Sequence, residues 1–415
     1  MYPRGSLAAT DMMVSYISLY GLVAAGVNAN FLKPLPPSFR HAAGSWAWLS
    51  YDIPDYAVLP GHFNRSVFAA PGEATVTDLR VVALNDKLNE TDFVAYDSSF
   101  FDFIGPYATV QKVLDLSHQT HEACCWVPGT NDIFFAEWGP PGGNNGQHNY
   151  QYLFDTATGN LRNLTTNPPT LNVHGCVAYE GLLYVVTDGG PGETAYFAKI
   201  DPKSWKRTTL LNHYYEQPFG AFNDLEVDKD GNFYLTDSKS GFFRHLVPYT
   251  PPTNPTTYFV DGKAFRPKAV HITTGNENGV SLSPDGKTIY LPNTGVSQGD
   301  TKDPYGERGL WAYDLVTLRG KRDSKAPVLT NARMLTNPIA NFYDGIRVTQ
   351  DGWILTGAND GVDVIDPVNG DILGSIRVGG DGEAVNMVLK GHDLWIVGRG
   401  GVWHISNIKT QLTKD

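Results

Sequence analysis

Short runs of apolar residues, joined in pairs by tight turns, recur along the chain from about residue 121 onward. Six segments share one pattern: a leading position, a run of β-forming residues, a turn that usually contains glycine, and a second run. Two such runs across an Asp-Gly type of turn are typical of a β-hairpin. The six leading positions are 122, 174, 223, 278, 344 and about 385.

The spacing of these hairpins predicts the fold. Consecutive leading positions are 52, 49, 55, 66 and 41 residues apart, and a repeat of this length indicates a solenoid or a β-propeller. Each interval has room for further strands, as at 195–201, 309–315 and 361–367, and four strands make one propeller blade. Amphipathic helix patterns are almost absent between the hairpins. We therefore predict an all-β fold, a six-bladed β-propeller with four antiparallel strands per blade.

The N-terminus predicts a secreted protein. Residues 12–27 are mostly apolar and are followed by small and polar residues, which predicts a signal peptide over residues 1–29. A buried N-terminal strand or helix is the alternative. Three glycosylation sequons, at Asn64, Asn89 and Asn163, agree with the secretory pathway and an extracellular location.

The segment before the first hairpin is expected to close the propeller. Residues 30–415 then form one domain, to which the segment from about 45 to 118 contributes closing strands. The apolar stretches 76–84 and 93–105 are expected to be outer strands that complete the ring against the last blade.

Composition and charge agree with this fold and exclude some classes of binding partner. The chain has 43 glycines, 27 prolines and 12% aromatic residues, which favours short strands and tight turns over long helices. It has 32 basic against 43 acidic residues, so no positive field is available for the phosphates of a nucleic acid. We expect a small-molecule substrate, no nucleic-acid partner, and no membrane partner after the signal peptide is removed.

The leading residues of the repeats predict a metal site. In a propeller the first strand of each blade lines the central channel, so Glu122, His174, Asn223, Asn278 and Asp344 should converge around the axis. Two carboxylates and two amide oxygens suit Ca²⁺, which prefers oxygen ligands, and buried carboxylates would hardly stay ionised without a cation. In any single segment these residues have the alternative of only forming a turn. Their recurrence in register predicts a site in the central channel for Ca²⁺ or another divalent metal.

Several of these segments resemble the gluconolactonase family, which includes senescence-marker protein and luciferin-regenerating enzyme. The segments NDLEVDKDGNFYLTDS from Asn223, NGVSLSPDGKTIYLPNTG from Asn278 and DGIRVTQDGWILTGAND from Asp344 resemble three of its blades. The segment at Glu122 resembles its opening blade, and 96–105 looks like the preceding segment of secreted fungal lactonohydrolases.

The resemblance implies a ligand set and an activity. In that family a glutamate, two asparagines and an aspartate hold one divalent metal, usually calcium, which corresponds here to Glu122, Asn223, Asn278 and Asp344. Asp344 is then the expected catalytic base for the water that attacks a lactone carbonyl. His174 stands where the fungal enzymes usually have asparagine, and we expect it to orient the substrate or move a proton. A neutral histidine that only lines the channel is the alternative.

The predicted function is that of a calcium-dependent lactonase, with His174, His121, Trp138 and Tyr343 as substrate-binding candidates. The substrate would be an aldonolactone-like lactone or a lactone of secondary metabolism. One alternative is a non-hydrolytic propeller enzyme of fungal secondary metabolism, a pericyclase or Diels-Alderase-like enzyme or a strictosidine-synthase-like cyclase. Another is a non-enzymatic binding propeller.

The three cysteines are too few for a disulfide scaffold. Cys124 and Cys176 each lie two positions after a leading residue, in adjacent blades. Because alternate residues of a strand share a face, we expect these two to pair. Cys125 would then be a small buried apolar residue.

Overall fold

The computed structural model describes residues 31–116, 120–138, 150–190, 192–298, 301–320, 325–379 and 382–413. Within these ranges the side chains of residues 120, 121, 138, 298 and 325 are not described. The predicted signal peptide, residues 1–29, lies outside the described residues.

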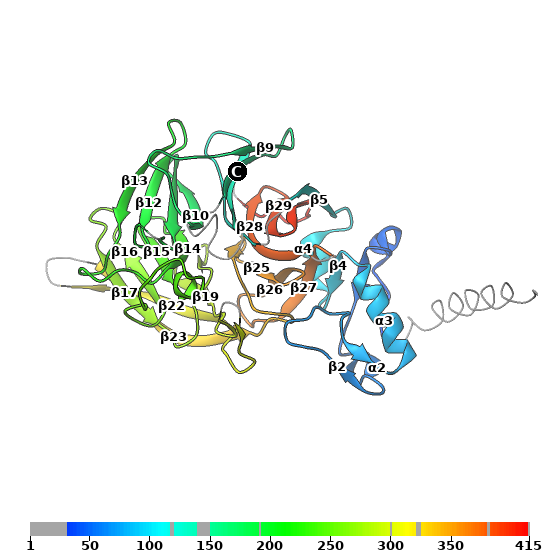
Figure 1. Ribbon diagram of the computed structural model, residues 1–415. Helices are drawn as coiled ribbons and strands as arrows, with labels where there is room; N and C mark the ends of the chain where they lie inside the picture. Colours follow the sequence, from blue (N-terminus) through cyan, green and yellow to red (C-terminus); the bar gives the residue numbers. More distant parts are fainter. Residues whose placement is uncertain are drawn as a thin grey trace, which may run out of the picture.

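The described part of the chain forms the predicted propeller, with six sheets arranged around a common centre (Figure 1). In each sheet four strands pair antiparallel, and the innermost strand is the first of its blade. Blade one has β6 (Thr120–Trp126), β7 (Asp132–Trp138), β8 (Tyr150–Asp155) and β9 (Asn160–Asn163). Blade two has β10 (Val173–Tyr179), β11 (Leu182–Thr187), β12 (Phe197–Asp201) and β13 (Lys206–Leu211). Blade three has β14 (Phe222–Val227), β15 (Phe233–Asp237), β16 (Thr256–Val260) and β17 (Pro267–Ile272).

The remaining blades follow the same order. Blade four has β18 (Ser281–Leu282), β19 (Thr288–Pro292), β22 (Leu310–Arg319) and β23 (Lys325–Thr336). Blade five has β24 (Ile346–Val348), β25 (Ile354–Ala358), β26 (Gly361–Ile365) and β27 (Ile372–Arg377). Blade six has β28 (Glu383–Lys390), β29 (Asp393–Arg399), β30 (Gly401–Ser406) and, from the N-terminal part, β5 (Thr109–Asp115).

The strand that closes the ring lies within the segment 45–118 but outside the two stretches that were expected to supply it. It is β5, which pairs antiparallel with β30, so three C-terminal strands and one N-terminal strand make up blade six. The expectation for 76–84 is wrong, because Leu79–Asn89 is a helix, α3, with Val81, Leu84 and Leu88 buried at helical spacing. Its first turn is capped by the Asp78 carboxylate, which accepts from the Arg80 N–H at 2.8 Å.

The expectation for 93–105 also needs correction. Only Phe93–Ala95 is a strand, β4, and it extends blade five by pairing with β27, while Ser99–Ile104 is a helix, α4. Strand β1 (Trp46–Trp48) adds to β4 in parallel. The other short elements are η1 (Pro37–Ala42), α2 (Pro54–Ala57), β2 (Phe63–Asn64), β3 (Thr75–Val76), α5 (Ser240–Phe243), β20 (Ser297–Gln298) and β21 (Thr301–Lys302). Figure 1 shows α2, α3 and β2 beside blade five, outside the ring.

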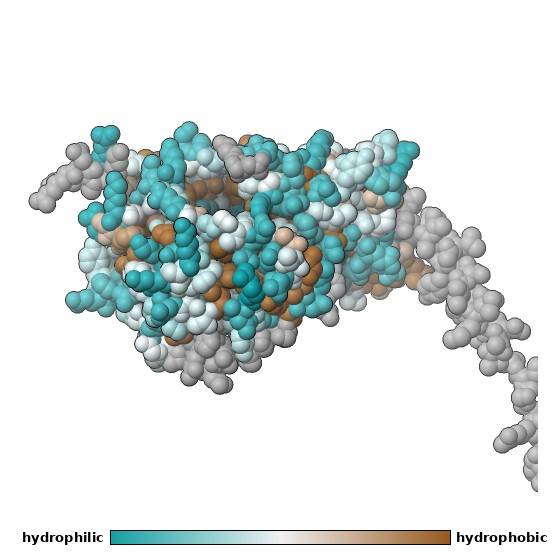
Figure 2. All heavy atoms as spheres, turned by 90° about the horizontal axis from the view of Figure 1, so that it is seen from above, coloured by the Kyte–Doolittle hydropathy of each residue, from teal (hydrophilic) through white to brown (hydrophobic). Residues whose placement is uncertain are grey.

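The core lies between neighbouring blades, and this explains the apolar runs in the sequence. A middle strand such as β15 has another blade on each face, so all five of its residues are buried and it need not alternate. Between blades two and three, Val186, Phe197, Phe222 and Leu235 belong to one buried cluster. On the face in Figure 2, hydrophilic side chains cover most of the surface and apolar residues show in recesses between them. No helix among the described residues is both long and apolar enough to cross a membrane.

The innermost strands contain β-bulges, and one of these bulges determines which cysteines form the disulfide. In β6 the extra residue follows Glu122, and Ala123 there has a φ of 60°. In β10 the extra residue is His174 itself. Equal distance from a leading residue therefore does not mean the same face of the strand. The predicted Cys124–Cys176 pair is wrong: the disulfide joins Cys125 to Cys176, and Cys124 is a buried free thiol.

Two glycines that follow leading residues allow the inner strands to approach closely. A Cβ on Gly345 would lie 2.6 Å from the side chain of Asn386 in blade six, and one on Gly175 would lie 2.7 Å from the Cα of Asp224 in blade three. Real Cβ contacts are longer than this. The glycines that follow His174 and Asp344 are therefore needed for packing around the axis.

Candidate active site

The structure brings the predicted ring residues together at the start of the inner strands. Glu122, His174 and Asn223 lie on β6, β10 and β14, while Asn278 and Asp344 lie three and two residues before β18 and β24. His174 Nε2 lies 3.5 Å from Glu122 Oε1 and 3.1 Å from Asn223 Nδ2. The Asn278 side chain hydrogen-bonds the Asp344 carboxyl. Five blades thus contribute one residue each to a polar cluster in which the charges of Glu122 and His174 act on Asp344.

Blade six contributes Asn386, which the sequence analysis missed. Its Nδ2 donates to Glu122 Oε2 at 3.4 Å, and the side chain is buried. The sixth leading position was assigned to the apolar residues 384–385. The bulge between Ala384 and Asn386 in β28 moves the polar residue into the ring.

His174 is held by a buried carboxylate that the sequence analysis also missed. His174 Nδ1 lies 3.0 Å from both oxygens of Asp188, and Ser240 Oγ donates to Asp188 Oδ1 at 2.7 Å. Asp188 follows β11 and has no exposed surface. A sequence feature that could have indicated Asp188 is the pair Thr187-Asp188 at the end of β11, which recurs in blade three as Thr236-Asp237.

The electrostatics of His174 follow from these contacts. Burial alone would lower the pKa of His174, but the Asp188 and Glu122 carboxylates raise it to about 10. With Nδ1 against Asp188, the Nε2–H of the imidazolium is directed at the Glu122 carboxylate. An imidazolium in this position is able to donate a proton from Nε2.

Asp344 is the ring residue whose hydrogen-bonding capacity is least used. Its Oδ1 is buried and has no hydrogen-bond partner among the described residues. Burial raises the pKa of the Asp344 carboxyl well above its usual range, and the negative charge of Glu122 raises it further. An unpartnered buried oxygen and a second carboxylate beside it, with the Asn278 amide in contact, fit a divalent cation bound through oxygen.

The metal centre predicted from the sequence is not itself seen. Among the described residues, no three His, Cys, Asp or Glu side chains are arranged to hold a metal ion. The expected donor set has only two carboxylates, Glu122 and Asp344, and its other two donors are the amides of Asn223 and Asn278.

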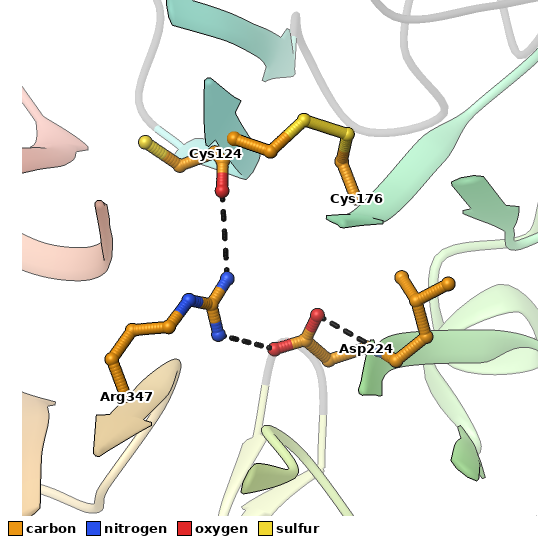
Figure 3. Close-up of a disulfide and its surroundings, with 6 residues drawn as sticks. Cys124, Cys176, Asp224 and Arg347 are labelled. Carbon is orange, nitrogen blue, oxygen red and sulfur yellow. Dashed lines mark hydrogen bonds and ion pairs between the residues drawn. A yellow bond between two sulfur atoms is a disulfide. The ribbon is translucent and has the colours of Figure 1, made fainter. Parts of the chain in front are cut away.

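A second charged layer crosses the channel beyond the ring, and the sequence analysis missed it. Arg347 of β24 lies three residues after Asp344, and its Nη1 is 3.3 Å from Asp224 Oδ2 while its Nη2 donates to the carbonyl of Cys124 at 3.4 Å (Figure 3). The guanidinium of blade five therefore contacts blades three and one. Burial raises the pKa of Glu226, and the charge of Arg347 opposes this. The available signal was a charged residue inside an apolar inner strand, as in Ile346-Arg347-Val348.

Of the remaining substrate-binding candidates, only Tyr343 has a side chain that the structure describes. Tyr343 has no exposed surface, packs in the core cluster with Leu310 and Ile354, and donates its hydroxyl to Asp363 Oδ2 at 3.1 Å. Its hydroxyl is thus bound within blade five, and its ring is packed between residues of blades four and five. The side chains of His121 and Trp138 lie outside the described residues.

The buried carboxyls predict how stability depends on pH. Burial raises the pKa of Asp363 to about 7 and that of Asp237 to about 6, from an ordinary value of 3.8. Both bind a proton more tightly in the folded than in the unfolded protein, so their contribution to the free energy of unfolding falls as pH rises from about 4 to about 7. We expect urea unfolding with excess chelator to show lower stability at pH 8 than at pH 5. Asp363→Asn should flatten this dependence, and an unchanged slope in that variant would contradict the assignment.

Comparison with known proteins places this geometry in a family. The model of the family described as "SMP-30/Gluconolactonase/LRE-like region" matches residues 147–397, which is more than half of the chain. The chain belongs to this family. The resemblance seen in the blade segments is therefore confirmed.

Two relatives and one solved structure show the extent of the similarity. Lactonohydrolase oryL of Aspergillus oryzae is 28% identical over 385 residues, covering 84% of this chain and 83% of the relative. A gluconolactonase of Zymomonas mobilis is 24% identical over 325 residues, covering 75% and 84%. The structure of XC5397, a gluconolactonase from Xanthomonas campestris, aligns with a TM-score of 0.60 at 19% identity, covering 76% of this chain and 94% of that one. This last similarity shows the fold.

Proposed function

We propose that this protein is an enzyme that hydrolyses a lactone in its central channel. The observation that supports this best is the pair of ring carboxylates, Glu122 and Asp344, with the buried and unpartnered Oδ1 of Asp344. Membership of the gluconolactonase-like family and similarity to relatives named lactonohydrolase and gluconolactonase agree with it.

The ring residues suit a divalent metal, for which we propose Ca²⁺. Glu122, Asn223, Asn278 and Asp344 would hold it, so that two negative charges face the ion's two positive charges. When bound, such an ion polarises the lactone carbonyl and stabilises the oxyanion that forms on it. Asn386 and His174 already contact Glu122 and would keep that carboxylate oriented.

Three residues of the chain would move protons or position the groups that do. Asp344 accepts the proton of the water that attacks the carbonyl carbon. His174, protonated at Nε2, donates a proton to the ring oxygen as its bond to the carbonyl carbon breaks. Asp188 keeps the imidazole in place through Nδ1. One proton is taken up and one is given back, and the product is an open hydroxy acid.

We also propose that the protein is secreted, with residues 1–29 as the signal peptide. The structure supports this indirectly, because all three sequon asparagines, Asn64, Asn89 and Asn163, are exposed. Exposed sequons are the ones that a glycosyltransferase reaches.

The function is tested by measuring acid release from an aldonolactone, pantoyl lactone and an aromatic lactone, with calcium and with excess chelator. We expect at least one to be hydrolysed with calcium, and its rate to fall by about a hundredfold or more with chelator. Restoring calcium after chelation is the control for irreversible unfolding. A protein that binds calcium but releases no acid from any lactone would contradict hydrolysis and favour a non-hydrolytic reaction in the same channel.

A further inference from the structure

Three segments that are distant in sequence meet beside Asp344. They are residues 65–69 of the N-terminal part, residues 293–298 and 301–309 of blade four with β20 and β21, and the loop 337–344 that enters blade five. The Asn341 N–H donates to the Val67 carbonyl at 2.6 Å, and Arg308 donates to the carbonyls of both Val67 and Asn341. The three segments are thereby fixed to one another.

Lys302, at the end of β21, is positioned where these segments meet. Its Nζ lies 5.3 Å from the ring centre of Phe68 and 5.4 Å from that of Phe342, and it donates to Ser297 Oγ at 3.3 Å. Each of the three segments thus contributes one contact to this ammonium group. Lys302 keeps much of its surface exposed and forms no ion pair with another described residue. Two aromatic faces hold a cation in place without neutralising it.

The ammonium group lies within the electrostatic field of the ring. Phe342 is two residues before Asp344, and the neighbouring Asn341 donates to Glu383 Oε1 at 3.2 Å. Partial burial lowers the pKa of Lys302, while Glu383 and Asp344 raise it. Other donors already occupy the Glu383 carboxylate, since Arg399 Nε contacts its second oxygen at 3.1 Å. The positive charge of Lys302 therefore remains available to a ligand.

We propose that Lys302 selects lactones that carry an anionic group, such as a carboxylate, by pairing with that group while the lactone ring lies at Asp344. This proposal rests on the proposed function and names its substrate class. The N-terminal segment then has a defined purpose, because Phe68 is one of the two rings that hold the Lys302 ammonium group.

The test compares two lactones that differ only in charge, γ-butyrolactone-γ-carboxylate and its neutral carboxamide. With calcium, kcat/KM of the wild-type protein should favour the carboxylate. Lys302→Met should lower kcat/KM for the carboxylate by about tenfold and leave the carboxamide unchanged. Lys302→Arg should restore much of the preference, and added salt should weaken the preference in the wild type and in Lys302→Arg.

The matched control is Lys287→Met. Lys287 is an exposed lysine on the turn between β18 and β19, at the opposite end of the same blade from Asn278. This substitution should leave kcat/KM for both lactones unchanged. Binding of both probes is also measured by calorimetry in proteins that carry Asp344→Asn, with and without Lys302→Met, because turnover is expected to be slow there.

These measurements separate failure of this proposal from failure of the proposed function. The assignment of Lys302 is overturned if the wild type has equal kcat/KM for the two probes. It is also overturned if Lys302→Met keeps the wild-type preference for the carboxylate, even where lactones are hydrolysed. A calorimetric preference for the carboxylate that disappears with Lys302→Met would support it. If in addition no lactone is hydrolysed, the proposed reaction is wrong and the anion site stands.

Discussion

Replacing Asp344 with asparagine is expected to lower lactone hydrolysis by about a thousandfold while leaving the propeller folded. Asparagine has the shape of the protonated acid and keeps an oxygen for the ring, but it cannot accept a proton from water. It also removes the repulsion between Asp344 and Glu122, so the chelated protein should be at least as stable as the wild type. The measurement is kcat for the best lactone with saturating calcium, together with thermal unfolding with chelator.

Asp363→Asn is the matched control for this variant. Asp363 is also a buried carboxyl with a raised pKa, but it belongs to blade five and accepts from Tyr343 and Ser375 outside the ring. It should retain hydrolysis. If Asp344→Asn hydrolyses lactones as fast as the wild type, Asp344 is not the base. Equal losses in the two variants would show a general effect of disturbing blade five.

Replacing Arg347 with methionine is expected to lower the free energy of unfolding by about 3 kcal/mol. The side chain of Arg347 is largely enclosed, and its removal leaves the buried carboxylate of Asp224 without its countercharge. Glu226, whose charge also faces Arg347, loses the same partner. The loss should be larger at pH 8 than at pH 5, because at low pH these carboxyls are able to take up protons instead. Urea unfolding at both pH values measures it.

Two further variants make this result interpretable. Arg333→Met breaks an ion pair with Asp314 whose two side chains are both partly exposed, and it should cost less than about 1 kcal/mol. Adding Asp224→Asn to Arg347→Met should recover part of the lost stability, because the unpaired charge is then gone. An Arg347→Met protein as stable as the wild type would mean that water or rearrangement satisfies both carboxylates.

The blades were predictable because each repeats the same local signal. This signal lies in neighbouring residues: a polar leading residue, two apolar runs and a glycine-containing turn. The spacing between successive repeats alone indicates a propeller. The N-terminal part has no such repeat. There Val81, Leu84 and Leu88 follow a helical period that a short apolar stretch does not distinguish from a strand.

The candidate site was predictable as far as the leading residues determine it. Its remaining parts depend on bulges and on contacts across the axis, which have no signature in neighbouring residues. The extra residue in β6 directs Cys125 rather than Cys124 to Cys176. A similar bulge moves Asn386 to the ring, and Arg347 is recognisable only once blades one, three and five are known to face one another.

The way the ring is closed has a consequence for how the protein is made. Strand β5 leaves the ribosome about 290 residues before β30, the strand with which it pairs. Blades one to five are completed in order while β5 has no partner strand. Strand β4 likewise has no partner in blade five until β27 is made. The nascent chain therefore displays unpaired strand edges for most of its synthesis, and such edges invite pairing with another chain. Strands β28 to β30 are translated last, and the pairing of β30 with β5 covers the exposed edge and joins the two ends of the propeller.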